Sequence, residues 1–139
     1  MARPTRNGTQ RDVFTNTSRT HQNRHTIRAA KRQANRQDRA AARRAVGMPQ
    51  DAVVLLFVGR IQPLKAPDVL VRAVARMIED APWRREKLRL VIVGGPSGSG
   101  LDKPLALQAL ARELGVKDVV DFVPPVDRST LVRWFHAAD

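Results

Sequence analysis

The sequence predicts an α/β fold: a Rossmann-like parallel sheet that is incomplete, with about three strands in the order βαβαβα. Two observations predict it. Three short apolar runs each end at glycine or proline, and the segments after them carry apolar residues at helical spacing. Strands that alternate with helices are joined by right-handed crossovers, so helices should cover both faces and ligands should bind at the carboxyl ends of the strands.

The first 37 residues form a basic arm. Residues 1–46 hold 12 Lys and Arg against two Asp, whereas the rest of the chain holds 13 against 11 acidic residues, so the net charge of +12 is concentrated near the N-terminus. Arg, Asn, Gln, Thr and Ser dominate residues 1–37, and apolar positions are too few to offset the entropy of ordering. We expect residues 1–37 to be largely disordered and residues 38–139 to form the folded part.

The folded part begins with a short helix and a strand. A helix is predicted over residues 38–46, capped by Asp38 and stopped by Gly47. The run 52–58 is continuously apolar and ends at Gly59, which is typical of a strand buried on both faces of a parallel sheet.

The remaining elements alternate. Helical spacing predicts a helix over residues 68–79 with Asp68 at its cap position, followed by a strand over 88–93. A helix over 105–114, a strand over 119–123 and a helix over 129–138 complete the series. Three strands are about half of an ordinary doubly wound sheet, so an open edge and an uncovered apolar face should favour recruitment of a partner or self-association, of which a homodimer is one form.

Composition excludes several classes of protein. The chain contains no cysteine, so neither a disulfide framework nor a thiolate metal site is available. It contains no run of about 18 apolar residues, and its first residues are polar, so membrane insertion and secretion are not expected. We therefore expect a cytoplasmic protein.

Two cations follow the first predicted strand. Arg60 and Lys65 leave the same strand end on a loop that Pro63 stiffens, and Gly59 lets the backbone approach a ligand. A guanidinium can bind two phosphate oxygens at once and an ammonium acts as a point charge, so the pair suits a diphosphate. The alternative, that Arg60 and Lys65 are only solvent-exposed charges of a loop, explains the local sequence about equally well.

The glycine-rich segment 94–100 follows the second predicted strand. It lacks both the Lys-Ser/Thr pair of a phosphate loop and the glycine spacing of a dinucleotide fingerprint. It is a turn into a helix whose N-terminus can receive an anionic or hydroxylated group, or an ordinary strand-to-helix connection. Carboxylates such as Asp118, Asp121 and Asp127 are more typical of caps and solvated charges, and no catalytic residue is assigned.

Four segments together resemble one family. They are Phe57 to Pro67 (FVGRIQPLKAP), Val91 to Gly100 (VIVGGPSGSG), Phe122 to Val126 (FVPPV) and Ala137 to Asp139 (AAD). The chain resembles the retaining GT-B glycosyltransferases of family 4, and among them the D-inositol-3-phosphate glycosyltransferases of mycothiol biosynthesis. The resemblance covers about Asp38 to Asp139.

The resemblance implies transfer of N-acetylglucosamine from UDP-N-acetylglucosamine to 1D-myo-inositol 3-phosphate, with retention at the anomeric carbon. Arg60 and Lys65 match the family's diphosphate-binding pair, and Val126 matches a position that lies near the uracil through its backbone. A helix-end site where backbone carbonyls hold Mg²⁺ is matched by Phe135, His136 and Ala138. No organic cofactor is implied.

The resemblance also implies that the chain is a fragment. The family's acceptor domain and its paired glutamates, which hold the ribose and the sugar, have no counterpart in this sequence. Residues 38–139 are therefore expected to be part of a donor-binding domain that is inactive alone and meets the inositol phosphate acceptor only in the full-length enzyme. Two alternatives stay open: a family 4 fragment with another acceptor, and a nucleic-acid-binding protein whose basic arm tracks phosphates. The arm's single aromatic residue, Phe14, makes nucleic acid the weaker reading.

Overall fold

The structure is a computed structural model that describes residue 36, residues 38–96 and residues 103–139. The predictions for the basic arm and for the second half of the glycine-rich segment fall almost entirely on residues outside these ranges. Residues Asp38–Asp139 form one unit, and the description below is confined to it.

Three parallel strands form one sheet. They lie in the order β1 (Val53–Val58), β2 (Leu88–Val93) and β3 (Val120–Val123). Val58 pairs with Val93 and Val93 with Val123, so the three strands end level with one another. The sequence predicts burial on both faces for the first strand, and this holds in part: Leu55 and Phe57 pack against one core and Val54 and Leu56 belong to the other, but β1 is an edge strand and of its residues only Val54 is fully buried. The central strand β2 is buried most fully, with five of its six residues buried.

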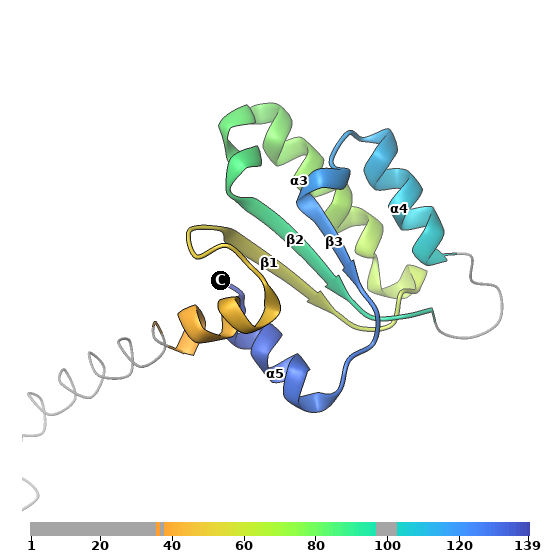
Figure 1. The fold of residues 1–139 in the computed structure, drawn as a ribbon. Coiled ribbons are helices and arrows are strands. Elements are labelled where there is room, and N and C mark those ends of the chain that lie inside the picture. Colours follow the sequence, from red (N-terminus) through yellow and green to blue (C-terminus); the bar gives the residue numbers. More distant parts are fainter. Residues whose placement is uncertain (1–35, 37, 97–102) are drawn as a thin grey trace, which may run out of the picture. The chain divides into compact units, whose positions relative to one another are not determined.

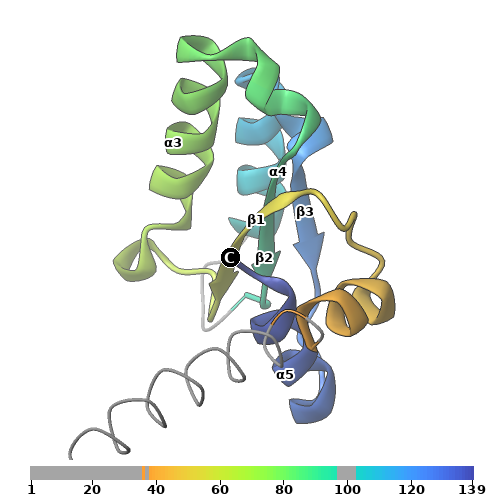
Figure 2. The same cartoon turned by 90° about the vertical axis from the view of Figure 1, so that its left-hand side faces the viewer.

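Helices cover both faces of the sheet, which confirms the predicted fold class. Figures 1 and 2 show α3 (Pro67–Asp80) and α4 (Lys103–Glu113) on one face, and α5 (Arg128–Ala137) with the helix over residues 38–46 on the other. Three short 3₁₀ turns connect these elements: η1 (Pro63–Lys65), η2 (Pro82–Glu86) and η3 (Lys117–Val119). None of the described helices is long and apolar enough to cross a membrane.

Each face has its own apolar core. The cores form because alternate side chains of a strand point to opposite faces, and each helix turns one apolar stripe toward the sheet. The larger core includes Val71 and Val74 of α3, Leu90 and Ile92 of β2, and Leu107 of α4. The smaller core includes Val54 of β1, Val91 and Val93 of β2, and Trp134 of α5.

The helix ends agree with the sequence in part. Gly47 ends the first helix with φ at 74°, as predicted. Asp38 is itself helical, so it lies inside that helix and does not cap it. Asp68 lies in the first turn of α3, and the cap position belongs to Ala66, whose backbone is left-handed. Propensity alone misses Ala66 because alanine rarely adopts this conformation.

Candidate functional site

The loops that follow β1 and β2 stay paired beyond the ends of the strands. The Ile61 N–H donates to the Gly95 carbonyl at 3.0 Å, and Ile61 forms an isolated parallel bridge with Pro96. The Ile61 side chain is itself buried in the larger core. Because Ile61 is held on both counts, Arg60 leaves the sheet from a fixed backbone position.

Gly94 allows these two loops to approach each other. A Cβ built on Gly94 would lie 1.9 Å from the carbonyl oxygen of Gly59, a distance that no side chain tolerates. The sequence predicts that Gly59 lets the backbone approach a ligand. A Cβ at Gly59 would meet the Phe57 ring at an ordinary 3.6 Å, although its φ of 158° is one that side chains rarely adopt. Gly94 is the glycine that the close approach of the two loops requires. Its signal in the sequence is a glycine at the end of each of two consecutive strands.

A hollow of about 400 Å³ opens at the carboxyl ends of the strands. Ligands of parallel α/β sheets bind at this edge. The structure brings two of the predicted site residues, Arg60 and Val126, into the lining of this hollow. Backbone of the glycine loop and apolar side chains supply the rest of the lining, including Gly94, Gly95, Pro125 and Leu131.

The charges of this hollow favour an anion. Arg60 is exposed, and its guanidinium makes no hydrogen bond or ion pair with the described residues. No carboxylate belongs to the described lining. A guanidinium that is not committed to a protein partner, beside an apolar wall, can bind phosphate oxygens while the wall accepts a flat or apolar group.

Lys65 does not line the hollow. It is the last residue of η1 and is exposed, and its N–H donates to the Gln62 carbonyl at 3.0 Å. Its side chain is long and has three donors on a flexible stem, so it can reach toward a ligand from the adjoining turn. The structure thus joins Arg60 with Val126 and leaves Lys65 beside them.

A larger hollow, of about 680 Å³, lies between η1, α3 and α4. Its lining includes Asp68 and Glu113, with Arg72 as the cation. Two carboxylates make this hollow less suitable for a diphosphate than the smaller one.

Asp127 caps the helix that follows Val126. Its carboxylate accepts hydrogen bonds from the Ser129 hydroxyl at 2.6 Å, the Thr130 N–H at 2.8 Å and the Thr130 hydroxyl at 2.9 Å. These bonds, the one from Ser129 first, hold the pKa of Asp127 well below its usual range. Asp127 is a cap, as expected from the sequence, and it fixes the start of α5 next to Val126.

The predicted metal residues lie at the opposite end of the sheet. Phe135, His136 and Ala138 are at the C-terminus of α5, where the Asp139 N–H donates to the Val54 carbonyl at 3.0 Å. Val54 lies four residues before the end of β1, so at about 3.3 Å per residue this point is about 13 Å from that end. Among the described residues, no group of three or more His, Cys, Asp or Glu could hold a metal ion.

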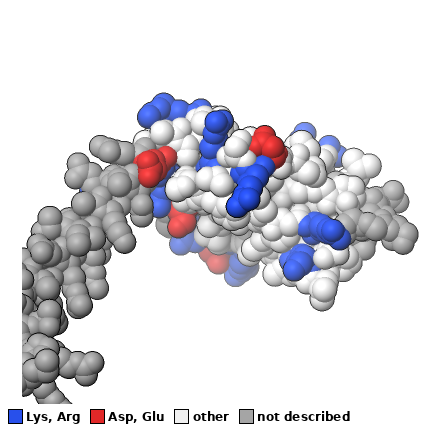
Figure 3. All heavy atoms as spheres, turned by 90° about the horizontal axis from the view of Figure 1, so that it is seen from below, with Lys and Arg blue, Asp and Glu red and all other residues white. Residues whose placement is uncertain are grey.

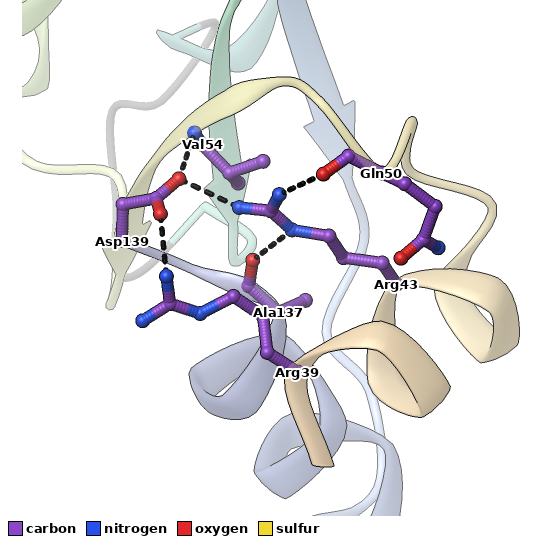
Figure 4. A network of polar contacts seen from close by, with 6 residues as sticks. All are labelled: Arg39, Arg43, Gln50, Val54, Ala137 and Asp139. Carbon is purple, nitrogen blue, oxygen red and sulfur yellow. Dashed lines mark hydrogen bonds and ion pairs between the residues drawn. The ribbon is translucent and has the colours of Figure 1, made fainter. Parts of the chain in front are cut away.

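A buried arginine organises the end of α5 (Figure 4). The Arg43 side chain is only 5% exposed. Its Nε donates to the Ala137 carbonyl at 2.9 Å and its Nη1 to the Gln50 carbonyl at 2.7 Å. Its Nη2 forms an ion pair with Asp139 at 2.6 Å. Arg43 therefore ties the first helix to the end of α5.

Asp139 completes this network at the edge of the sheet. Its carboxylate accepts a hydrogen bond from the Val54 N–H at 2.8 Å and an ion pair from Arg39 at 2.8 Å. The sequence predicts Arg39 and Arg43 only as helix formers. Their i, i+4 spacing, which places both on one face of the helix, was the available signal.

Outside the hollow, the described surface carries both basic and acidic side chains. Figure 3, seen from below, shows Lys and Arg distributed over that face with Asp and Glu among them. Several described pairs neutralise one another, including Arg85 with Asp118 at 2.6 Å and Arg76 with Glu79 at 3.0 Å. In Figure 3 the Lys and Arg side chains lie in separate groups with other residues between them, so the drawn part of this face offers no continuous basic surface for nucleic acid.

The fold and the hollow together define a Rossmann-like α/β domain with a ligand-sized site at the carboxyl ends of its strands. The sequence model of the family described as glycosyl transferases group 1 matches residues 38–139, so the chain belongs to this family. The D-inositol 3-phosphate glycosyltransferase 2 of Catenulispora acidiphila is 64% identical over 102 residues, which are 73% of this chain and 24% of that protein. The D-inositol 3-phosphate glycosyltransferase of Kribbella flavida is 58% identical over 101 residues, which are again 73% of this chain and 24% of that protein. The chain thus spans about a quarter of the length of these relatives.

Solved structures agree with this assignment. WaaG, a glycosyltransferase involved in lipopolysaccharide biosynthesis, is 28% identical with a TM-score of 0.59, over 73% of this chain and 25% of that one. Anabaena Alr3699/HepE, solved in complex with UDP and glucose, has a TM-score of 0.59 over 74% of this chain and 25% of its own. It is 21% identical, so it supports the fold alone. The parallel sheet with its helices matches the GT-B fold of these neighbours.

Proposed function

We propose that residues 38–139 bind the donor of a glycosyltransferase, UDP-N-acetylglucosamine, at the hollow formed by the carboxyl ends of β1, β2 and β3. The observation that carries the proposal is that Arg60 and Val126, far apart in sequence, line one hollow that has no carboxylate in its described lining. Arg60 binds the diphosphate in bidentate fashion, and Lys65 adds a second positive charge from η1. The backbone at Val126 lies against the uracil.

The same residues have a role in the reaction. A sugar that leaves its diphosphate places negative charge on the phosphate oxygens, and fixed cations stabilise that charge as it develops. We propose that the complete enzyme transfers N-acetylglucosamine to 1D-myo-inositol 3-phosphate in mycothiol biosynthesis, in the cytoplasm. Support for this acceptor comes from the D-inositol 3-phosphate glycosyltransferases that share 58–64% of the matched residues.

Calorimetric titration of the purified chain with UDP and with UDP-N-acetylglucosamine tests donor binding. We expect the wild type to bind both ligands, and Arg60→Ala and Lys65→Ala each to weaken binding roughly tenfold or more, as loss of a hydrogen bond to a charged group predicts. Arg112→Ala is the matched control, because Arg112 is exposed in the last turn of α4, at the other end of the sheet. A folded wild type without heat of binding would refute donor binding by this chain.

We also propose that the carbonyls of Phe135, His136 and Ala138 hold Mg²⁺. Helix geometry supports oxygen ligands here, because the last carbonyls of a helix have no intrahelical donor and carry partial negative charge. Arg43 already occupies the Ala137 carbonyl between them. A cation at this place would stabilise the end of α5, about 13 Å from the end of β1 by strand rise, and would not touch the diphosphate.

Thermal melting together with titration of UDP distinguishes an ion that stabilises the end of α5 from an ion that takes part in binding the diphosphate. Excess Mg²⁺ should raise the midpoint for unfolding relative to chelator and leave the affinity for UDP unchanged. A Mg²⁺-dependent affinity for UDP would contradict a purely structural ion. A midpoint that does not respond to Mg²⁺ would contradict the site itself.

A further inference from the structure

The turn that carries Lys65 contains a backbone conformation that its sequence disfavours. Ala66 has φ 47° and ψ 47°, and it is the one residue other than glycine with positive φ in the part of the chain that the structure describes. A Cβ clashes with the following carbonyl oxygen in this left-handed region, whereas glycine adopts it freely. Ala66 is therefore strained where glycine would not be.

Neighbouring residues hold Ala66 in this conformation. Its N–H donates to the Pro63 carbonyl at 2.9 Å, and its carbonyl accepts from the Val69 N–H at 3.1 Å. Ala66 is thus the last residue of one hydrogen-bonded turn and the first of the next, as the cap of both η1 and α3. Pro67 follows it and disfavours a right-handed helical backbone at Ala66. Hydrogen bonds to the residues before and after Ala66 therefore fix its backbone conformation.

Lys65 depends on this turn for its direction. Its side chain is exposed and makes no hydrogen bond or ion pair with the described residues. Only the backbone therefore aims it, through the bond from its own N–H to the Gln62 carbonyl at 3.0 Å. Strain that persists beside a binding residue is commonly part of the preorganisation of a site.

We propose that Ala66 is a positioning residue: its left-handed backbone, restricted by a Cβ, preorganises η1 so that Lys65 points at the diphosphate. This inference rests on the proposed function for its ligand. Glycine at position 66 would relieve the strain but would also open conformations that alanine forbids. Stability and affinity should then change in opposite directions, which a residue with only a structural role would not cause.

The test is Ala66→Gly, measured by thermal melting, by titration with UDP and by NMR relaxation of the Lys65 amide without ligand. We expect a midpoint equal to or above that of the wild type, an affinity for UDP lower by roughly two- to fivefold, and a more mobile Lys65 amide. The loss of affinity should disappear when Ala66→Gly is combined with Lys65→Ala, since the positioned group is then absent.

Gly47→Ala is the matched control. Gly47 also has a left-handed backbone, with φ at 74°, and a Cβ there would meet nothing within 4 Å. The substitution therefore exchanges glycine and alanine at a left-handed position away from the site. It should lower the midpoint and leave the affinity for UDP unchanged. An equally rigid Lys65 amide in Ala66→Gly, or a loss of affinity that persists without Lys65, would overturn the positioning role. If the wild type binds no UDP, the proposed function fails, and the amide measurement still decides whether Ala66 orders the turn.

Discussion

The Nη2 atom of Arg43 lies 2.6 Å from Oδ2 of Asp139, and the two residues are 96 positions apart in the sequence. This contact joins the first helix of the folded part to the chain end after α5. The same Asp139 side chain accepts from the Val54 N–H, so one carboxylate connects a helix, a strand edge and a buried guanidinium. The network lies at the amino end of the sheet, away from the hollow.

Arg43→Ala should destabilise the chain by about 3 kcal/mol, because it leaves two carbonyls without their donor and removes the buried cation that pairs with the Asp139 carboxylate. Urea denaturation measures the change in the free energy of unfolding. The control is Arg44→Ala, since Arg44 is exposed and its loss should cost less than about 0.5 kcal/mol. Similar losses for both variants would show that the network contributes little.

Gly94→Ala should destabilise the fold by about 3 kcal/mol or more and abolish binding of UDP. The added Cβ would lie 1.9 Å from the Gly59 carbonyl oxygen, so the two loops that form the hollow must separate. Gly47→Ala carries backbone strain without a clash and should cost only about 1 kcal/mol. Melting and UDP titration of both variants compare the two effects. Retained UDP affinity in Gly94→Ala would mean that the close approach of the loops is not needed.

Asp127 should make stability depend on pH in the acid range. Its pKa is lowered in the folded state, so its contribution is fully present above the unfolded value, near 3.8, and is lost as the pH falls from there toward the folded pKa. Asp127→Ala should therefore melt at a lower temperature than the wild type at neutral pH, and the difference should shrink as the pH falls below that value.

Asp127→Asn is the control for charge. An asparagine side chain can still accept a hydrogen bond from the Thr130 N–H but does not titrate. This variant should therefore lie between wild type and Asp127→Ala in stability, and it should lack the contribution of Asp127 to the pH dependence. A difference between wild type and Asp127→Ala that stays constant down to the lowest measurable pH would contradict this role.

The outer edge of β1 should make the chain self-associate. Val53 donates toward β2, so alternation along the strand turns the N–H and C=O groups of Leu56 and Val58 outward, where no described strand pairs with them. We expect sedimentation velocity to show a dimer or larger species that grows with concentration.

Val53→Lys should reduce this association, because a charged side chain on an edge strand opposes pairing. Val132→Lys on α5 is the control, since Val132 has the same exposed fraction, 46%, but lies away from the edge. A monomer at every concentration, or equal effects of the two substitutions, would be evidence against association through β1.

Local sequence predicted most of the elements of the fold. Apolar runs that end at glycine or proline mark β1, β2 and β3, since a strand buried in a parallel sheet has few polar positions and the chain must turn where it ends. Helical spacing marks α3, α4 and α5 for the same local reason. Arg60 was predicted as a site residue because its position follows from the strand that precedes it.

Tertiary structure decided what depends on contacts between distant residues. The sequence by itself shows that Gly59 and Gly94 end two strands, but only the level pairing of β1 and β2 makes Gly94 the glycine without room for a Cβ. The sequence likewise predicts that Arg43 lies in a helix, but its guanidinium is buried against Asp139 only because the end of α5 returns to the start of β1. Local propensity acts over a few residues, whereas these interactions join segments that meet only once the sheet has formed.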